Sequence, residues 1–536
     1  MKNLQTIDLF AGAGGLSYGF LQSKKCEVKL AVEFDKNAQL TYKENHPYVD
    51  MLDDINTIDF KKLRVEYNNV DLIIGGPPCQ GFSNANRQRN YIISPKNQLV
   101  KKYIEAVDTL NPNIFVMENV KTIASDKHKF IYSKNDESTI QKLNVELHEE
   151  NILIGSAPLH PEIFLNFITE NADNFNTDFL LPDNIDSIYK QLMKKSSSEE
   201  TFTEYFDKKI SSIKRILAKW TIDEQAFWHN SYAQINRRLY LALTVEDTDV
   251  NFDMVKTCLE IITETNKTLK RASDITHYKL NYNNLRYENN SIYFSAKSYN
   301  IIEFIEKKFT KKGYSIVSGI MNAADFGVPQ LRERFIMIGI KTTILQKELT
   351  MPSPSFSKDQ YITIGDAILD LQELSPTTKL DDYKPIKRKT PAMKTTKYLD
   401  WIADSDTIFN HITTATRETA IKRFKVLKQG QNFHSLADDL KTTYTSPEKT
   451  QNTIYKRLEI DKPSDTVVNV RKSMWIHPNL DRAISIREAA RLQSFPDSFV
   501  FHGKKDAQYQ QIGNAVPPIL GKAIADHILN VIDTSN

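Results

Sequence analysis

The first third of the chain alternates short apolar runs with loops of small or polar residues. Apolar runs fall at residues 7–10, 28–32, 71–74 and 114–117. Runs of this length are typical of strands that a parallel sheet buries on both faces. The first run leads through a small-residue loop, residues 11–15, into a segment that predicts a helix. Strand, glycine loop and helix in this order predict a nucleotide-binding βαβ unit in an α/β fold.

The glycine loop and the acidic residues after it suggest which ligand such a unit would take. The loop GAGG, residues 12–15, departs from the dinucleotide-binding pattern, because Ser17 stands where the third glycine would be. Glu33 ends the second strand about 20 residues later, where a carboxylate usually holds ribose hydroxyls. Asp54 and Ile55 follow a third predicted strand. Each feature alone also fits a tight turn or a solvated acid, but together they indicate an adenosine-containing cofactor.

The fourth predicted strand ends in the sequence Gly-Gly-Pro-Pro-Cys, residues 75–79. The prolines fix φ and stop the strand, so Cys79 is expected at the carboxyl end of a central strand, where open α/β sheets bind ligands. Most buried cysteines are small hydrophobic residues. A cysteine on a rigid turn beside polar residues is a better candidate nucleophile. Glu118 ends the next strand, which predicts a thiol and a carboxyl group at neighbouring strand ends.

Composition and charge limit the class of protein. A length of 536 residues predicts more than one domain. The formal net charge is only +3, so any basic surface must be local. No apolar run reaches about 18 residues and no signal pattern is seen, so no membrane span or export is expected. Three scattered cysteines argue against a disulfide framework or a metal site, and favour a reducing cytoplasmic setting.

Ordered motifs extend along the chain. They are DLFAGAGGLSYGF, GGPPCQGFS, MENV, FGVPQLRERFIMIGI and REAARLQSFPDSF followed by QYQQIGNAVPPILGKAIADHI. Together they resemble the motifs of the carbon-5 cytosine-specific DNA methyltransferases of bacterial restriction-modification systems. The resemblance implies a Rossmann-like domain that uses S-adenosylmethionine to methylate carbon 5 of a cytosine. It also implies that the cytosine belongs to a specific duplex DNA sequence and is flipped out of the duplex, because carbon 5 is inaccessible inside it.

The resemblance also implies roles for individual residues. Cys79 is expected to attack carbon 6 of the cytosine, and Glu118 to act at ring nitrogen 3. Arg334 would hold the cytosine carbonyl and brace Glu118, while Arg332 would meet a phosphate or support the loop that carries Cys79. The expected DNA contacts are Ser83, Arg87, Arg89 and Gln330. The expected cofactor pocket contains Phe10, Gly12, Gly14, Glu33, Phe34, Asp54, Ile55, Gly76, Pro78, Leu99 and Asn514.

The same resemblance predicts the domain organisation. The catalytic domain takes residues 1–122, 301–341 and 457–536, and its last helix, from Pro517 onward, should return beside the glycine loop. A target recognition domain is expected at residues 342–456. Residues 123–300 form a predicted insertion with apolar residues at helical spacing, hence a largely helical subdomain. The basic residues of this insertion around 208–219 predict a solvated helix face rather than a binding surface.

The expected partners are double-stranded DNA and a cognate restriction endonuclease as a functional partner. The chain is expected to act as a monomer at the bacterial nucleoid. Three alternatives remain open at this level. An RNA cytosine methyltransferase would share the motifs but have a smaller segment before KRLEIDKP. Intact Cys79, Glu118 and Arg334 argue against a catalytically silent DNA-binding protein, and the missing third glycine argues against a dinucleotide-dependent oxidoreductase.

Overall fold

The computed structural model describes residues 3–78, 95–125, 129–156, 161–171, 175, 180–219, 231–245, 251–380, 384–388 and 396–532. The chain divides into two compact units. The first comprises Met1–Cys79, Gln98–Ser125 and Lys308–Asn536, and the second comprises Gln80–Asn97 and Asp126–Lys307. Within the described ranges, no helix combines the length and the apolar character that crossing a membrane requires.

A seven-stranded sheet forms the centre of the first unit, with spatial order β10-β11-β5-β4-β1-β2-β3. Strands β1 to β5 are parallel to one another, and β11 is antiparallel to both of its neighbours. The strands are β1 (Leu4–Leu9), β2 (Cys26–Val32), β3 (Asp50–Leu52), β4 (Leu72–Gly75), β5 (Ile114–Val120), β10 (Tyr314–Asn322) and β11 (Glu333–Lys341). This is the α/β, Rossmann-like architecture that the apolar runs predict.

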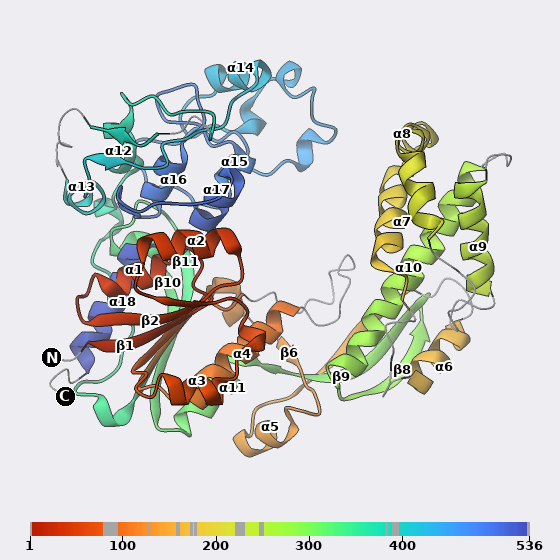
Figure 1. The fold of residues 1–536 in the computed structure, drawn as a ribbon, viewed down its shortest axis with the longest axis horizontal. Helices are drawn as coiled ribbons and strands as arrows, with labels where there is room; N and C mark the ends of the chain where they lie inside the picture. Colours follow the sequence, from red (N-terminus) through yellow and green to blue (C-terminus); the bar gives the residue numbers. More distant parts are fainter. Residues whose placement is uncertain are drawn as a thin grey trace. The chain divides into compact units, whose positions relative to one another are not determined.

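Helices cover both faces of this sheet. Figure 1 shows α1 (Gly15–Leu21), α2 (Lys36–Asn45) and α18 (Pro518–Val531) on one side, and α3 (Phe60–Glu66) and α4 (Pro95–Leu110) on the other. Helices α1 and α18 pack against each other and bury apolar side chains over the strands. The predicted return of the C-terminal helix to the N-terminal loop is therefore confirmed, and the two ends of the chain complete one core.

The remainder of the first unit has few regular elements and two hydrophobic cores. Residues 364–412 share one core with residues 458–512. A smaller core involves residues 420–476. The elements are α12 (Ile364–Ile368), β12 (Ile386–Lys387), α13 (Lys397–Ile402), β13 (Thr407–Ile408), α14 (Glu418–Val426), α15 (Val470–Ser473), α16 (Ile486–Leu492) and α17 (Lys505–Asn514). The predicted recognition domain, residues 342–456, is thus distributed between two cores, and its boundaries stay a prediction.

Buried arginines hold the irregular segments of the smaller core together. The Arg457 guanidinium donates to the carbonyls of Phe424 and Leu427 and pairs with Asp481 at 2.5 Å. Arg423 donates to the hydroxyl of Tyr455 and lies over its ring. Arginines in or beside a predicted recognition domain are common candidates for DNA contacts. These two arginines instead join interior segments of the chain by hydrogen bonds. Backbone carbonyls that irregular structure leaves without partners need such donors.

The second unit has a hydrophobic core of its own, which draws on residues 131–296. It contains an antiparallel sheet of β6 (Lys129–Ile131), β7 (His148–Ser156), β8 (Tyr282–Glu288) and β9 (Ser291–Asn300). Its helices are α5 (Glu137–Leu143), α6 (Pro161–Asn171), α7 (Asp183–Lys195), α8 (Glu199–Leu217), α9 (Ser231–Thr244) and α10 (Phe252–His277), and α11 (Ile301–Thr310) follows. The prediction of a largely helical insertion missed this sheet.

The turn between β8 and β9 carries a sequence signal from which part of this sheet could have been predicted. Asn289 and Asn290 join the two strands, and both have positive φ, at 49° and 57°. A two-residue turn with positive φ at both positions favours asparagine and matches the twist of the flanking strands. The Asn-Asn pair between two runs rich in tyrosine is therefore a hairpin signal in the sequence.

Candidate active site

The candidate active site lies where the strand order of the central sheet reverses. Strands β1 and β4 are neighbours, and the order of the parallel strands runs outward from this pair in both directions. Open α/β sheets bind ligands at such a switch point, beyond the carboxyl ends of the strands. The glycine loop follows β1, and the Gly-Gly-Pro-Pro turn follows β4. The two most distinctive loops of the sequence therefore meet at one edge of the sheet.

The glycine loop has an unusual backbone and a carboxylate beside it. Phe10 is half-buried with φ 62°, and Gly12 and Gly14 have φ 56° and 90°. A bulky residue at positive φ is strained, and such strain concentrates at ligand-binding sites. The Gly12 amide donates to Glu33 Oε2 at 2.8 Å, and the Asp35 amide donates to Oε1 at 2.7 Å. Burial raises the pKa of Glu33, and these two hydrogen bonds act against that rise.

The other predicted cofactor residues differ in how far they are exposed to solvent. Phe34 follows Glu33 and is 74% exposed, which is unusual for phenylalanine. Asp54 accepts from the Asn56 amide at 2.9 Å and so caps a short 3₁₀ turn in which Ile55 is buried. Pro78 is half-buried after β4 and Leu99 is half-buried on α4, whereas Asn514 is exposed at the end of α17.

Glu118 lies against the turn that leads to Cys79. Its carboxyl group is 9% exposed at the end of β5. A Cβ added at Gly76 would lie 2.7 Å from Glu118 Oε2, so the missing side chain makes room for the carboxyl group. The next residue, Asn119, donates from Nδ2 to the Pro77 carbonyl at 2.7 Å. The sequence analysis gave Asn119 no role, although its place in MENV beside Glu118 was a signal.

Arg334 completes this arrangement. Strand β11 pairs with β5, which places Arg334 opposite Val120 and brings its Nε to 2.9 Å from Glu118 Oε1. Burial raises the pKa of Glu118, while the charges of Arg334 and Arg332 act against the rise. A rise in pKa favours the protonated form of a carboxyl group, which can donate to a ligand nitrogen. The predicted pairing of Glu118 with Arg334 is present in the structure.

Two further predicted residues, Arg332 and Gln330, are buried and join interior segments of the chain by hydrogen bonds. The Arg332 guanidinium is fully buried and donates to the carbonyls of Val467 and Gly513 at 3.1 and 2.9 Å, so the phosphate role predicted for it does not fit. Gln330 is also fully buried. It accepts from the Val467 amide at 2.7 Å and donates to Gln493 Oε1 at 2.8 Å. The prediction that Gln330 contacts DNA is wrong, because its amide group is committed to the interior.

The predicted nucleophile and three predicted DNA contacts, Cys79, Ser83, Arg87 and Arg89, lie outside the described residues. The other two cysteines, Cys26 and Cys258, are buried. Burial raises the pKa of Cys26 to about 11 and also raises that of Cys258, which suppresses the reactive thiolate at both. No group of three or more His, Cys, Asp or Glu side chains in the described ranges could hold a metal ion.

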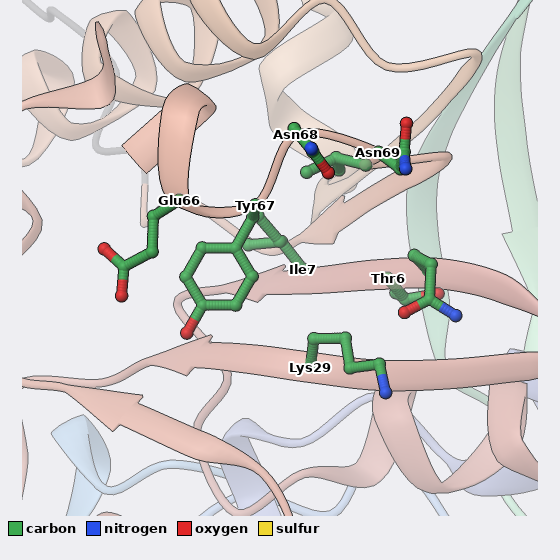
Figure 2. Close-up of a pocket in the computed structure, with 9 residues that line it drawn as sticks. Thr6, Ile7, Lys29, Glu66, Tyr67, Asn68 and Asn69 are labelled. Carbon is green, nitrogen blue, oxygen red and sulfur yellow. The ribbon is translucent and has the colours of Figure 1, made fainter. Parts of the chain in front are cut away.

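A separate pocket of about 390 Å³ lies along β1 before the glycine loop (Figure 2). Thr6, Ile7, Lys29 and Tyr67 are among its lining residues. None of the predicted catalytic or cofactor residues lines it. The pocket is therefore distinct from the candidate active site.

Comparison with known proteins decides the family. A model of the C-5 cytosine-specific DNA methylase family matches residues 4–151 and 279–530. The chain belongs to this family. The match leaves out residues 152–278, all of which belong to the second unit, so the methylase carries an insertion that the family model does not contain.

Curated relatives are similar over nearly the whole methylase chain. The type II methyltransferase M.DdeI of Desulfomicrobium norvegicum is 25% identical, with 99% of this chain and 92% of the relative covered. The type II methyltransferase M.AgeI of Thalassovita gelatinovora is 26% identical, with 98% and 99% covered. A crystal structure described as a DNA modification methyltransferase encoded within an E. coli prophage has a TM-score of 0.54 at 19% identity, with 99% of each chain covered. This structural likeness supports the fold.

The protein is thus a DNA cytosine-5 methyltransferase. Family membership removes the dinucleotide-dependent oxidoreductase from the alternatives. It also agrees with the motif order and with the α/β fold. The roles of individual residues, the methyl donor and the mode of DNA recognition are proposed below.

Proposed function

We propose that the methylase transfers a methyl group from S-adenosylmethionine to carbon 5 of a cytosine flipped out of a specific duplex DNA sequence. The observation that carries this proposal is the buried Glu118–Arg334 pair at 2.9 Å. Glu118 lies against Gly76, and Asn119 bonds to the Pro77 carbonyl, so the strand that carries Glu118 is fixed to the backbone that leads to Cys79. A proton-bearing carboxyl group, a cation and a thiol are the three groups that activation of a cytosine ring needs.

The residues of the glycine loop fit S-adenosylmethionine. Glu33 offers a buried carboxylate at the place where ribose hydroxyls are usually held, and exposed Phe34 beside it suits stacking against adenine. A Cβ added at Gly12 would meet nothing within 4 Å, so the backbone there is open to a ligand. When bound, S-adenosylmethionine supplies an electrophilic methyl group on a sulfonium. The other proposed cofactor residues are Phe10, Gly14, Asp54, Ile55, Gly76, Pro78, Leu99 and Asn514.

Cytosine carbon 5 is a poor nucleophile, so the chain must first activate the ring. The Cys79 thiolate adds to carbon 6 while Glu118 shares its proton with nitrogen 3, which takes up the displaced electron pair. Arg334 holds the cytosine carbonyl and keeps Glu118 in place. Carbon 5 then bonds to the methyl group, and the methyl–sulfur bond breaks. Loss of the carbon 5 proton to solvent, elimination of the Cys79 thiolate and return of the nitrogen 3 proton to Glu118 restore the aromatic base.

DNA recognition is proposed for two regions. Ser83, Arg87 and Arg89 follow Cys79 directly, and their side chains suit contacts to phosphates and base edges. Residues 342–456 are proposed to read the target sequence. Gln330 and Arg332 are left out, because their polar groups bond within the interior.

The biological role is proposed from the relatives. Both relatives described above are named type II methyltransferases, which favours modification of host DNA in a restriction-modification system. A cognate restriction endonuclease would then be a functional partner. A monomer that acts at the nucleoid of the bacterial cytoplasm is the simplest form of such an enzyme.

Covalent trapping tests the proposal. Bisulfite sequencing of DNA from cells expressing the chain would first identify the target sequence. A duplex with 5-fluorocytosine at the target cytosine should then form a stable adduct with Cys79, because fluorine cannot leave as the carbon 5 proton does. Mass spectrometry locates the adduct, and the Cys79→Ser variant should form none while still binding the duplex.

The two buried cysteines provide an internal control for this experiment. An adduct on Cys26 or Cys258, or full turnover by Cys79→Ser, would overturn the assignment of the nucleophile. Methylation confined to transfer RNA, with none on duplex DNA, would favour the RNA-acting alternative instead.

A further inference from the structure

Ser17 occupies the position where a dinucleotide-binding loop has its third glycine, and the proposed mechanism does not use it. Its side chain is fully buried. The Ser17 hydroxyl donates to Asp8 Oδ2 at 2.5 Å and lies 2.8 Å from the hydroxyl of Tyr42. A serine hydroxyl has one proton, so when Asp8 is ionised the Tyr42 hydroxyl donates to Ser17 and Ser17 donates to Asp8. Asp8 and Tyr42 are also buried.

These three residues connect the elements that surround the glycine loop. Asp8 is on β1 just before the loop, Ser17 is on α1 just after it, and Tyr42 is on α2. Tyr42 also packs beneath the loop, because a Cβ added at Gly14 would lie 2.9 Å from its ring. His46 lies against the Tyr42 ring at a centroid distance of 4.5 Å, and its Nε2 has no hydrogen-bond partner among the described residues.

We propose that Tyr42, Ser17 and Asp8 form a hydrogen-bonded relay that positions the glycine loop and places a negative charge beneath it for a cationic sulfonium donor. Ser17 and Tyr42 are positioning residues in this relay, since they act through Asp8 and the loop. The inference rests on the proposed use of S-adenosylmethionine. Ser17 is then a functional replacement for the third glycine, because only a side chain with a hydroxyl can link Tyr42 to Asp8.

The charge on Asp8 should depend on pH in the neutral range. Burial raises the pKa of Asp8 to about 7; the Ser17 hydrogen bond acts to lower it, and the charge of Glu33 adds to the rise. Burial also holds the pKa of Tyr42 and of Tyr103 on α4 well above its usual value, so both stay neutral. It lowers the pKa of His46 to about 4, so its ring is neutral too.

The direction of the pH effect follows from these neighbours. As pH rises through about 7, Asp8 loses its proton and the site becomes more negative. A cationic sulfonium should therefore bind more tightly at pH 8 than at pH 6, and a neutral thioether of the same shape should not. Removal of the Ser17 hydroxyl removes the hydrogen bond that lowers the pKa of Asp8. The midpoint of the pH dependence of sulfonium binding should therefore move to higher pH.

Calorimetric titration of the full-length protein tests the relay. S-adenosylmethionine and its neutral product S-adenosylhomocysteine would each be titrated between pH 6 and 8.5 into wild type, Ser17→Ala and Tyr42→Phe. Tyr48→Phe is the matched control, because Tyr48 is 96% exposed. We expect Ser17→Ala to bind the sulfonium about tenfold more weakly at pH 7 with a midpoint at higher pH. Tyr42→Phe should change in the same direction by less, and Tyr48→Phe should match wild type.

Each other outcome has a separate meaning. Equal losses of affinity for both ligands, with an unchanged midpoint of the pH dependence, would show that Ser17 and Tyr42 have a purely structural role. This result would overturn the relay. Wild-type affinity and wild-type pH dependence in both variants would do the same. Failure of all four proteins, wild type and Tyr48→Phe included, to bind either ligand would overturn the proposed donor. Tyr42→Phe removes a single oxygen, so it keeps the test valid if Ser17→Ala does not fold.

Discussion

At Gly76 a single added carbon would disturb the candidate active site directly. The position of a Cβ there is 2.7 Å from Glu118 Oε2, a distance that real contacts do not reach. The carboxyl group would have to leave its place beside Arg334 or the turn before Cys79 would have to shift. Either movement misaligns the group proposed to protonate the base, and small misplacements of catalytic groups are costly.

Gly76→Ala should therefore lower turnover by about tenfold to a hundredfold. Affinity for S-adenosylhomocysteine should fall by less than turnover, because Gly76 is one of many proposed cofactor residues and the contacts of Glu33 and Phe34 are left intact. Steady-state methylation kinetics and calorimetric titration measure the two effects. Gly319→Ala is the matched control, since its nearest contact would be an ordinary 3.5 Å to Met351. Equal turnover in both variants would show that Glu118 does not need this space.

At the scale of elements, the approach to β11 is held by the Gln330 amide group and the Arg332 guanidinium rather than by a regular strand pair. Gln330 bridges the segment at Val467 and the end of α16, where its Nε2 also donates to the Leu492 carbonyl at 3.2 Å. Arg332 bridges the same segment to α17 through Val467 and Gly513. These two side chains connect parts of the first unit that are far apart in the chain, and they orient the strand that carries Arg334.

Gln330→Ala should lower the free energy of unfolding by about 2–4 kcal/mol, because it leaves buried amide and carbonyl groups without partners. The salt dependence of DNA binding should not change, since no phosphate contact is lost. Urea unfolding and DNA titrations at several salt concentrations measure both. Exposed Gln346→Ala serves as the control. A reduced salt slope with unchanged stability would restore the DNA-contact assignment.

At the scale of the whole molecule, charge is divided unevenly between residues 126–307, the larger part of the second unit, and the rest of the chain. Residues 126–307 contain 28 acidic and 22 basic residues, of 67 and 70 in the whole chain. The rest of the chain therefore holds the positive surplus, which suits a DNA-binding catalytic unit. An excess of acids in the insertion agrees with the prediction that Lys208, Lys209 and Arg215 form a solvated helix face.

Two units with separate cores should unfold in two transitions. Leu259 is buried in the core of the second unit, and Ile336 is buried in the sheet of the first. Leu259→Ala and Ile336→Ala should each destabilise one unit by about 2–5 kcal/mol and lower a different calorimetric transition. S-adenosylhomocysteine should raise only the transition that Ile336→Ala lowers, because the proposed donor site belongs to the first unit. A single transition that both variants lower would show that the units fold as one.

The sequence by itself determined the family and the α/β sheet, and it supplied the candidates for the central groups. Short apolar runs specify strands locally, and the residues at their ends are contiguous in the motifs, so Cys79, Glu118 and Glu33 could be named. Only the tertiary structure decided where the side chains of Gln330, Arg332 and Ser17 lie and which groups they bond. Their roles depend on partners far along the chain or on neighbouring helices. Whether a polar side chain faces DNA or fills the interior depends on those contacts, which no local pattern specifies.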